Sequence, residues 1–298
     1  MRGMFAESMT VGDAIAWGAT TLDESDEMGQ HTREDALLLL RHVLGISQAE
    51  IFASRERPLT ALQTEAFNAL IRQRSRGVPI QYLTGVQEFF GLPFHVTPAV
   101  LIPRPETEHL VEAAIERLQS RPAPAIADIG TGSGAIAVAL AQALPNAHIV
   151  ALDISPIALE VARQNATRNG VAEHIRFVES DLFAASALLT DHLFDAIVSN
   201  PPYIAERERK SLPKEVRDYE PALALFAGPT GLEFYQRLIP AAHAHLATDG
   251  WLLMEIGHGQ RDAVHALLQG QEQPPPWNAI EFLPDLQSIP RVAIARKG

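Results

Sequence analysis

The sequence predicts an α/β protein in which a doubly wound, mostly parallel sheet follows a small N-terminal helical domain, with a β-hairpin linker between them. Helical patterns fill the first eighty residues, and strand and helix patterns alternate from about residue 121 onward. The chain of 298 residues also exceeds what one core usually holds. We expect a helical, partner-recognising domain at 1–80, the linker at 81–105 and the sheet domain at 106–298.

Three amphipathic helices are expected in the N-terminal domain. Their apolar faces are Val11, Ile15, Gly18 and Leu22; Leu37, Leu40, Arg41 and Leu44; and Leu62, Phe67, Leu70 and Ile71. We expect the three helices to start at Thr10, Thr32 and Thr60, with Asp35 and Gln63 three residues after the second and third of these. Gly45 and Gly77 are expected to end the second and third helices. Packing in a helical core explains all of these residues. A helical module attached to a catalytic domain more often recognises a partner than performs chemistry, and we expect this domain to do so.

The linker and the sheet domain are expected from changes in periodicity. Gln87–Val96 alternates loosely and carries Gly and Pro, as a hairpin does. The expected strands are Ala125–Ile129, Ile149–Leu152, Ile175–Val178, Phe194–Ser199, Trp251–Ile256 and Val292–Ala295. The expected helices are Leu110–Leu118, Ala135–Leu144, Pro156–Asn169 and Leu232–Leu246. Open α/β sheets bind ligands at the carboxyl ends of their strands, so the segments that follow these strands are the candidate site.

Composition narrows the class of function. The chain has no cysteine and therefore no disulfide framework, which fits a reducing, cytoplasmic setting. Residues 1–22 show no signal-peptide pattern, and no apolar run is long enough to cross a bilayer. A net charge of −12 speaks against a large phosphate-binding surface. His243 and His245 are two apart on a helix and point to different sides, so we expect no metal site.

A glycine-rich turn, Gly130–Gly134, joins the first expected strand to a helix. Glycines let the backbone turn tightly and approach a ligand, and the helix N-terminus behind them attracts negative charge. Asp153 ends the next strand, 23 residues after Gly130, where a carboxylate can accept both hydroxyls of a ribose. We therefore expect a nucleoside ligand. The spacing Gly130-x-Gly132-x-x-Ala135 also fits a dinucleotide fingerprint, which keeps NAD open on this turn alone.

Acidic residues at other strand ends favour S-adenosylmethionine over NAD. Asp128 precedes the glycines, where a carboxylate can meet the ammonium of a methionine moiety, and Asp181 with Leu182 can frame an adenine. A dehydrogenase would need a hydride partner, and no acid/base pair is offered for one. Asp128 and Asp181 taken singly are explained as well by a loop or a cap. Together with Asp153 they place carboxylates at three successive strand ends, which indicates one site.

The segment Asn200-Pro201-Pro202-Tyr203 follows the fourth strand. Two prolines stiffen the backbone and leave its carbonyls free, Asn200 offers an amide acceptor, and Tyr203 offers a flat ring. The Asn200 Oδ1 and the Pro201 carbonyl can accept both hydrogens of an –NH2 on a planar group while the ring packs on its face. A proline-rich turn explains the four residues equally well when they are taken alone.

Several motifs resemble those of the bacterial peptide chain release factor glutamine N5-methyltransferases, a family of class I methyltransferases with a Rossmann-like fold. They are D-I-G-T-G-S-G at 128–134, N-P-P-Y at 200–203, Q-Y-L-T-G at 81–85, E-F-F-G-L-P-F at 88–94, L-I-P-R-P-E-T-E at 101–108, Y-E-P-A-L-A-L at 219–225 and P-R-V at 290–292. The resemblance covers nearly the whole chain. The first helices match the family's N-terminal domain in position rather than by a sharp motif.

The resemblance implies methyl transfer from S-adenosylmethionine to the side-chain amide of the glutamine in the Gly-Gly-Gln loop of release factors. With the residues considered above, the implied cofactor contacts are Asp128, Gly130, Thr131, Gly132, Ser133, Gly134, Asp153, Asp181, Leu182 and Asn200. The glutamine would be held by Asn200–Tyr203, with Asn200, Pro201 and Tyr203 in the catalytic role and Pro202 beside them. The partner would be a release factor, without stable nucleic-acid binding or a membrane, and the enzyme would act as a cytoplasmic monomer.

Three other functions stay open from the sequence. The segment Asn200–Tyr203, which we call the clamp, also suits glutamine methylation of a large-subunit ribosomal protein. It suits adenine N6-methylation of DNA or RNA less well, because the chain is acidic. A non-catalytic nucleoside-binding module is a third possibility, although intact glycines, Asp153 and the clamp weigh against it. Arg207, Arg209 and Lys210 are expected to form a solvated loop rather than a partner contact. Arg104 and Glu106 are explained by a proline-set turn at least as well as by a ligand contact.

Overall fold

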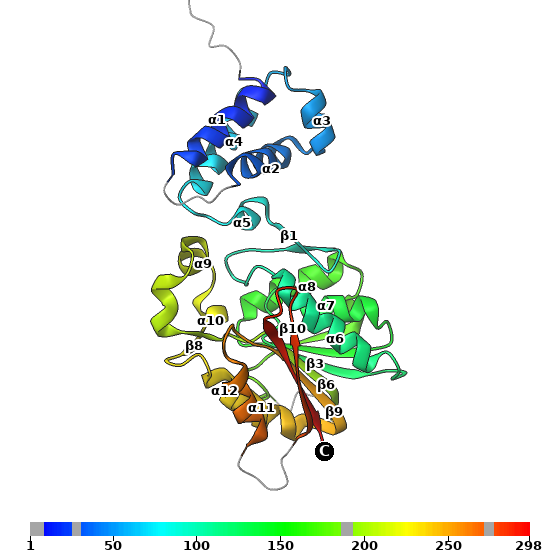
Figure 1. The fold of residues 1–298 in the computed structure, drawn as a ribbon. Coiled ribbons are helices and arrows are strands. Elements are labelled where there is room, and N and C mark those ends of the chain that lie inside the picture. The colour runs from blue at the N-terminus through cyan, green and yellow to red at the C-terminus, as the bar shows by residue number, and fades with distance from the viewer. Residues whose placement is uncertain (1–8, 26–30, 186–192, 271–276) are drawn as a thin grey trace, which may run out of the picture. The chain divides into compact units, whose positions relative to one another are not determined.

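The computed structural model describes residues 9–25, 31–185, 193–270 and 277–298 (Figure 1). The chain forms two compact units, one made of Met1–Gly85 and Pro213–Tyr219, the other of Val86–Leu212 and Glu220–Gly298. This division departs from the expected boundaries in two ways. The hairpin expected as a linker belongs to the sheet unit, and a short segment from late in the chain belongs to the helical unit. The late segment carries no strong periodicity, so its sequence gives no signal of this assignment.

The helical unit is built on one apolar core. Its helices are α1 (Val11–Asp23), α2 (Thr32–Leu44), α3 (Gln48–Ala53), α4 (Ala61–Arg74), α5 (Ile80–Thr84) and α9 (Lys214–Tyr219). Capping boxes at Thr10 and Thr60 start α1 and α4, as the sequence predicts, and a third at Ser47 starts α3. The expected face of α1 is buried in full, whereas Leu62 of α4 is 79% exposed. The core therefore begins deeper into α4 than its apolar pattern indicates.

The expected cap and apolar face of α2 are wrong. Thr32 lies inside the helix, His31 precedes it without a side-chain cap, and the Thr32 hydroxyl donates to Asp23. Asp35 accepts a hydrogen bond from Arg74 and so does not complete a capping box. The buried face consists of Thr32, Ala36, Leu39 and Leu40, so only Leu40 of the expected stripe is buried. An almost continuous leucine run fits several helical faces, and tertiary packing selects one of them.

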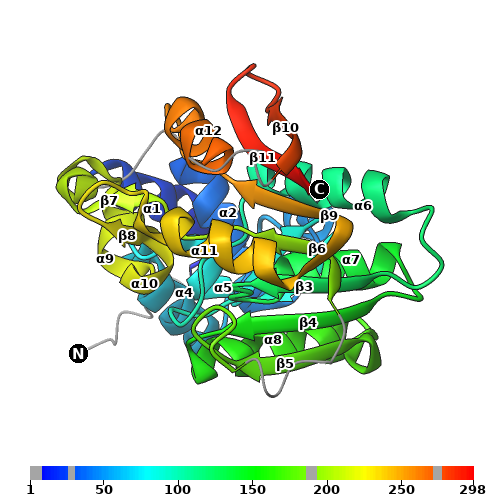
Figure 2. The same cartoon turned by 90° about the horizontal axis from the view of Figure 1, so that it is seen from below.

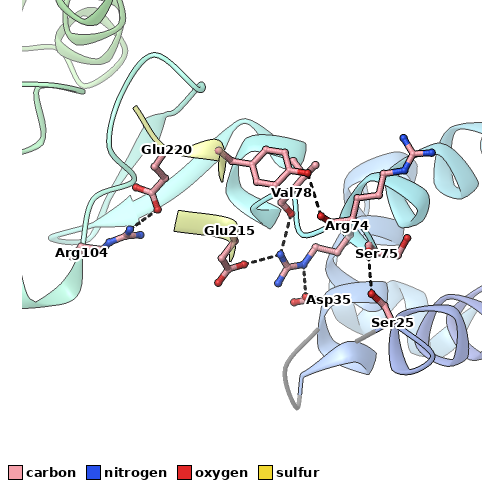
Figure 3. A network of polar contacts seen from close by, with 10 residues as sticks. Ser25, Asp35, Arg74, Ser75, Val78, Arg104, Glu215 and Glu220 are labelled. Atoms are coloured by element: carbon pink, nitrogen blue, oxygen red, sulfur yellow. Dashed lines mark hydrogen bonds and ion pairs between the residues drawn. The ribbon is translucent and has the colours of Figure 1, made fainter. Parts of the chain in front are cut away.

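An arginine of α4 ties α9 to the helical unit (Figure 3). The Arg74 guanidinium donates to Asp35 Oδ2 at 2.7 Å, to Glu215 Oε2 at 2.8 Å and to the Val78 carbonyl at 2.9 Å. The Tyr219 hydroxyl adds a 3.2 Å hydrogen bond to the Arg76 carbonyl. A half-buried guanidinium shared by two carboxylates is a stronger link than an exposed ion pair, so α9 is fixed to this unit by specific chemistry.

The sheet unit confirms the doubly wound, mostly parallel sheet. In the described residues the main sheet has the order β10-β11-β9-β6-β3-β4-β5. Its strands are β3 (Ala125–Ile129), β4 (His148–Asp153), β5 (Ile175–Glu179), β6 (Phe194–Ser199), β9 (Leu246–Glu255), β10 (Trp277–Pro284) and β11 (Pro290–Lys297). The first five run parallel, and β11 pairs antiparallel with both β9 and β10. The antiparallel β10 was not expected, because its Asn278, Glu281 and partly exposed neighbours give no apolar run.

Helices cover both faces of this sheet (Figure 2). They are α6 (Glu108–Leu118), α7 (Ala135–Ala143), α8 (Pro156–Arg168), α11 (Glu233–His245) and α12 (Arg261–Gln269), while the short α10 (Ala222–Leu225) lies beside β8. Strand residues alternate between two apolar clusters: Ile126 and Val198 pack with α6 and α7, while Ala127 and Ile197 pack with α11 and α12. The two-sided burial explains why the strands read as continuous apolar runs.

Shorter elements complete the sheet unit. The expected hairpin forms from β1 (Val86–Phe89) and β2 (Leu92–His95), and β7 (Ile204–Ala205) pairs with β8 (Phe226–Gly228). The 3₁₀ turns are Pro105–Thr107, Ala172–His174 and Glu206–Ser211. The last of these contains Arg209, which binds Glu206 and lies over the Phe226 ring, while Arg207 and Lys210 are exposed. In the described part of the chain, no helix is long and apolar enough to cross a membrane, and no group of three metal-ligating side chains gathers.

The chain reverses its winding direction at β3. From β3 it proceeds to β4 and β5 on one side, then returns to β6 and β9 on the other. Such a reversal opens a crevice at the carboxyl ends of the central strands, where open α/β sheets bind ligands. The glycine turn follows β3, Asp153 ends β4 and Asn200 follows β6, so the fold brings the predicted site residues to one edge.

Candidate active site

A cavity lies at this edge of the sheet unit and encloses about 1080 Å³, including its opening to solvent. Nine of the predicted residues line it: Gly130, Thr131, Gly132, Ser133, Asp153, Asp181, Leu182, Asn200 and Pro202. Asp128, Gly134, Pro201 and Tyr203 are not among its lining residues. The cavity therefore joins the glycine turn to the N-P-P-Y segment, while four predicted residues support its walls.

Backbone conformation shapes the glycine turn. Gly130, Gly132 and Gly134 have φ values of 70°, 56° and 81°, in the left-handed region that side chains disfavour. Gly134 also packs closely, since a Cβ there would lie 3.1 Å from the Cβ of Ala162. The Gly130 and Thr131 amides both donate to the Leu152 carbonyl, which fastens the turn to the end of β4. The sequence thus needs glycine here for conformation at all three positions, and for space at one.

Asp153 is held in a fixed orientation at the end of β4. Its Oδ2 accepts from the Gly132 amide at 2.8 Å and its Oδ1 from the Ser155 amide at 2.9 Å. Burial raises its pKa, and the hydrogen bonds from these amides oppose that rise. A carboxylate has about four acceptor positions, so each oxygen keeps capacity for a hydroxyl donor from a ligand in the cavity.

Asp128 lies beneath the turn rather than in the cavity. It is fully buried, and its Oδ2 accepts from the Thr131 hydroxyl at 2.7 Å and from the Ala137 amide at 3.2 Å. Its Oδ1 is buried with no hydrogen-bond partner among the described residues. Burial raises the pKa of Asp128 to about 7. A buried acceptor without a partner is costly, and it is the kind of group that a ligand ammonium would satisfy.

Asp181 and Leu182 border the cavity beyond β5 in different ways. Asp181 is exposed, and its Oδ2 accepts a 2.6 Å hydrogen bond from Arg237. Leu182 is 9% exposed and has a φ of 51°, unusual for a branched side chain. Leu182 and Ile154 both line the cavity and give it apolar surface.

Asn200 is held at the end of β6 by a side chain distant in sequence. Its Nδ2 donates to the Thr107 Oγ1 at 2.9 Å. The Thr107 hydroxyl in turn donates to the Glu255 Oε2 at 2.5 Å. Because the Asn200 nitrogen is engaged, its Oδ1 is the amide atom left to accept a hydrogen bond from a guest in the cavity.

Tyr203, the last residue of the clamp, is held by hydrogen bonds from both its side chain and its backbone. Its hydroxyl donates to the Glu255 Oε1 at 3.2 Å, and its backbone carbonyl accepts from the Gln260 side chain at 2.8 Å. Burial raises the pKa of the Tyr203 phenol well above its ordinary value, so the phenol keeps its proton and acts as a donor. The structure thus gives the partly buried Tyr203 a hydrogen-bonding role, and the packing of its ring on a ligand stays a prediction.

Sequence reasoning missed four supporting residues: Thr107, Asn165, Glu220 and Glu255. Buried Asn165 bonds the His95 backbone on β2 and the Ser133 carbonyl at 2.8 Å, which ties the hairpin to the glycine turn. Buried Glu220 binds Arg104 and accepts from the Ile102 amide, which joins two of the quoted motifs. Arg104 therefore has a structural partner. The position of Glu255 at a strand end, like that of Asp153, was the one available signal.

A glycine turn after one strand and the N-P-P-Y segment after the neighbouring strand, at the reversal of such a sheet, are the arrangement that the sequence predicts for a methyltransferase. Residues 108–216 match the model of the Methyltransferase small domain and residues 13–85 that of the PrmC N-terminal domain. The chain is 43% identical over 265 residues to the Release factor glutamine methyltransferase of Koribacter versatilis, covering 89% of this chain and 91% of that protein. It belongs to the release factor glutamine methyltransferase family.

Two further comparisons agree with this assignment at different levels. The chain is 50% identical over 230 residues to the Release factor glutamine methyltransferase of Chlorobaculum tepidum, covering 75% of this chain and 78% of that protein. The crystal structure of the hMettl16 catalytic domain in complex with the MAT2A 3′UTR hairpin 6 matches with a TM-score of 0.55 at 18% identity. That match covers 76% of this chain and 81% of the other and supports the fold alone.

Proposed function

We propose that this enzyme transfers a methyl group from S-adenosylmethionine to the side-chain amide nitrogen of the glutamine in the Gly-Gly-Gln loop of release factors. The observation that carries the proposal is the single cavity lined by both the glycine turn and Asn200. A cofactor held on one side and a planar amide held on the other are then brought together, which is what group transfer requires. The family of the chain supports the choice of glutamine.

The residues of the glycine-turn side fit S-adenosylmethionine. Asp153 lines the cavity, and its two oxygens keep acceptor capacity for ribose hydroxyls beside their bonds to backbone amides, while Ile154 and Leu182 supply apolar surface for an adenine. Asp128 lies beneath this turn rather than in the cavity, and its part in the fit is to hold the turn through Thr131 and Ala137. When bound, the cofactor supplies a methyl group that is already strongly electrophilic, so no acid is needed to activate it.

The residues of the N-P-P-Y segment fit a primary amide. The Asn200 Oδ1 and the Pro201 carbonyl accept the two N–H groups, which leaves the face of the amide nitrogen directed at the cofactor side. Positive charge that develops on this nitrogen is stabilised by both acceptors. One N–H proton must leave once the methyl group is bound, and we propose that it passes to water. The helical unit is proposed to recognise the release factor.

A methyl-transfer assay tests this function. Purified enzyme is incubated with labelled S-adenosylmethionine and, separately, with a release factor, its Gln→Ala variant in the Gly-Gly-Gln loop, a large-subunit ribosomal protein and DNA. We expect label on the intact release factor and none on the variant. Label only on the ribosomal protein or DNA would overturn the proposed substrate but keep the methyltransferase activity. Absence of label with cofactor bound would favour a non-catalytic binding module.

A further inference from the structure

Thr107 lies between the Asn200 amide and a buried carboxylate. It is the last residue of the 3₁₀ turn Pro105–Thr107 and leads directly into α6, with a helical backbone at φ −68° and ψ −18°. Its buried side chain makes no cap hydrogen bond to α6, and its hydroxyl contacts Asn200 and Glu255 instead. The polar partners of this side chain are therefore both distant in sequence.

The hydrogens of this network can be assigned from its chemistry. A threonine hydroxyl carries one hydrogen, which it donates to the Glu255 Oε2, so its oxygen is left to accept from Asn200. Glu255 also accepts from Tyr203 and is 2% exposed, so an ionised carboxylate matches both neighbours. The chain of donors therefore runs in one direction, from the Asn200 nitrogen through Thr107 to Glu255.

We infer that Glu255, acting through Thr107, is a positioning residue that sets the orientation of the Asn200 amide and so turns its Oδ1 toward the substrate nitrogen. The inference deepens the proposed function and rests on it. If Thr107 donated to Asn200 instead, the Asn200 amide would have to flip by half a turn. Its –NH2 would then face the substrate –NH2, two donors would oppose each other, and the substrate would lose its acceptor.

Protonation of Glu255 is what reverses this direction. Burial raises its pKa to about 7, the hydrogen bonds from Thr107 and Tyr203 oppose the rise, and the charge of Glu106 adds to it. Arg291 lowers the pKa, and the Tyr235 hydroxyl faces Glu255 by donating to its backbone carbonyl at 3.0 Å. A protonated Glu255 must itself donate a hydrogen bond, and if that bond goes to Thr107 the threonine hydrogen turns toward Asn200.

Four variants of the full-length enzyme test the inference: Thr107→Val, Thr107→Ser, Glu255→Gln and the double variant Thr107→Val with Glu255→Gln. Glu116→Gln on α6 is the control, because its side chain is 75% exposed. The readouts are the single-turnover rate on the release factor from pH 5.5 to 9, at saturating cofactor, and cofactor affinity by titration calorimetry. Thr107→Val keeps the shape of the side chain and removes the hydroxyl, and Thr107→Ser restores the hydroxyl.

We expect Thr107→Val and Glu255→Gln each to lower the rate about a hundredfold, the scale of a misaligned reacting group, with cofactor affinity nearly unchanged. The double variant should be no slower than either single variant, because both break one relay. Thr107→Ser should keep a much larger share of the rate than Thr107→Val. The wild-type rate should rise through an apparent pKa of about 7, and Thr107→Val should lose this inflection.

Different results overturn different claims. Equal rates for Thr107→Val and Thr107→Ser, additive losses in the double variant, or an inflection retained in Thr107→Val would overturn the relay while the wild-type enzyme still labels the release factor. If Glu255→Gln does not fold, the valine and serine variants decide the question without it. A wild-type enzyme that labels no release factor at any pH would overturn the proposed function and the relay with it.

Discussion

The two sides of the cavity are built in different ways. The glycine-turn side, made of Asp128, Gly130–Gly134 and Asp153, comes from 26 consecutive residues and is shaped by backbone conformation and backbone amides. The clamp side, made of Thr107, Asn200, Tyr203 and Glu255, comes from residues up to 148 positions apart and is held by side-chain hydrogen bonds. The first side is local in sequence, and the second exists only in the fold.

This difference indicates a division of labour. A pocket built from backbone amides suits a cofactor that is bound in the same way in every reaction cycle, because its geometry needs few specific side chains. A planar amide must be held in one orientation with its two hydrogens engaged, and that demands side chains locked by further side chains. The account therefore predicts that damage to the clamp side lowers the rate of methyl transfer, while damage to the glycine-turn side lowers cofactor affinity.

The largest effect is expected at the clamp. Asn200→Ala removes the proposed acceptor for the substrate amide and should lower the single-turnover rate about a thousandfold, the loss seen when one charge-stabilising group is removed. Cofactor affinity should stay nearly intact. Rapid-quench measurement with labelled cofactor gives the rate, and calorimetry gives the affinity. An equal loss in both would place Asn200 on the cofactor side and remove the contrast between the two sides.

The matching change on the other side is Asp153→Asn. It removes the charge that would accept the ribose hydroxyls while keeping the size of the side chain, so cofactor affinity should fall about tenfold to a hundredfold. The rate at saturating cofactor should change far less than in Asn200→Ala. Both are read from the dependence of the single-turnover rate on cofactor concentration. A variant with normal affinity and a slow rate would contradict the assignment of Asp153.

A third test uses pH and stability. Burial raises the pKa of Glu255 from 4.5 to about 7, so its contribution to stability is full below 4.5 and is lost as pH rises through 7. Glutamine does not titrate, so Glu255→Gln has no such loss. The free energy of unfolding of the variant minus that of the wild type should therefore be about 2 kcal/mol larger at pH 8 than at pH 5. Urea unfolding at both pH values measures this. A difference independent of pH would mean that the Glu255 carboxyl does not titrate with a raised pKa.

The smallest effects are expected from two glycine-to-alanine substitutions, one at Gly134 of the glycine turn and one at Gly170 in the turn after α8, which separate conformation from space. Gly134→Ala should cost about 2 kcal/mol, because φ is 81° and the new Cβ meets Ala162 at 3.1 Å. Gly170→Ala has a similar φ of 72° with nothing within 4 Å, and should cost about 1 kcal/mol. Chemical unfolding compares them. Equal losses would show that the Ala162 contact does not matter.

Much of the fold could be predicted because its signals are local. The β3 to β6 strands are apolar runs, the glycines at 130–134 predict a tight turn, and Gly and Pro residues predict the hairpin. The failures are also physical. The α2 face was ambiguous because leucines surround it, β10 lacks an apolar run, and α9 joins the helical unit through Arg74 and Glu215, which are 141 residues apart.

The same reasoning explains which site residues were found. Gly130, Asp153 and Asn200 could be predicted because each follows a recognisable strand, and the structure brings them to one cavity. Thr107 reads as an ordinary helix start and Glu255 as the end of a buried strand, so neither shows its role until the fold brings them together at 2.5 Å. A relay made of side chains leaves no periodic trace in the sequence.

The position of the transferred methyl group on the release factor decides whether this enzyme methylates the glutamine amide. The release factor is methylated with the purified enzyme and digested. Its Gly-Gly-Gln peptide is then fragmented in a mass spectrometer to locate the methyl group within the peptide. We expect a methyl group on the side-chain amide nitrogen of the glutamine, present with wild-type enzyme and nearly absent with Asn200→Ala. A methyl group on any other residue, or the same yield from Asn200→Ala, would contradict it.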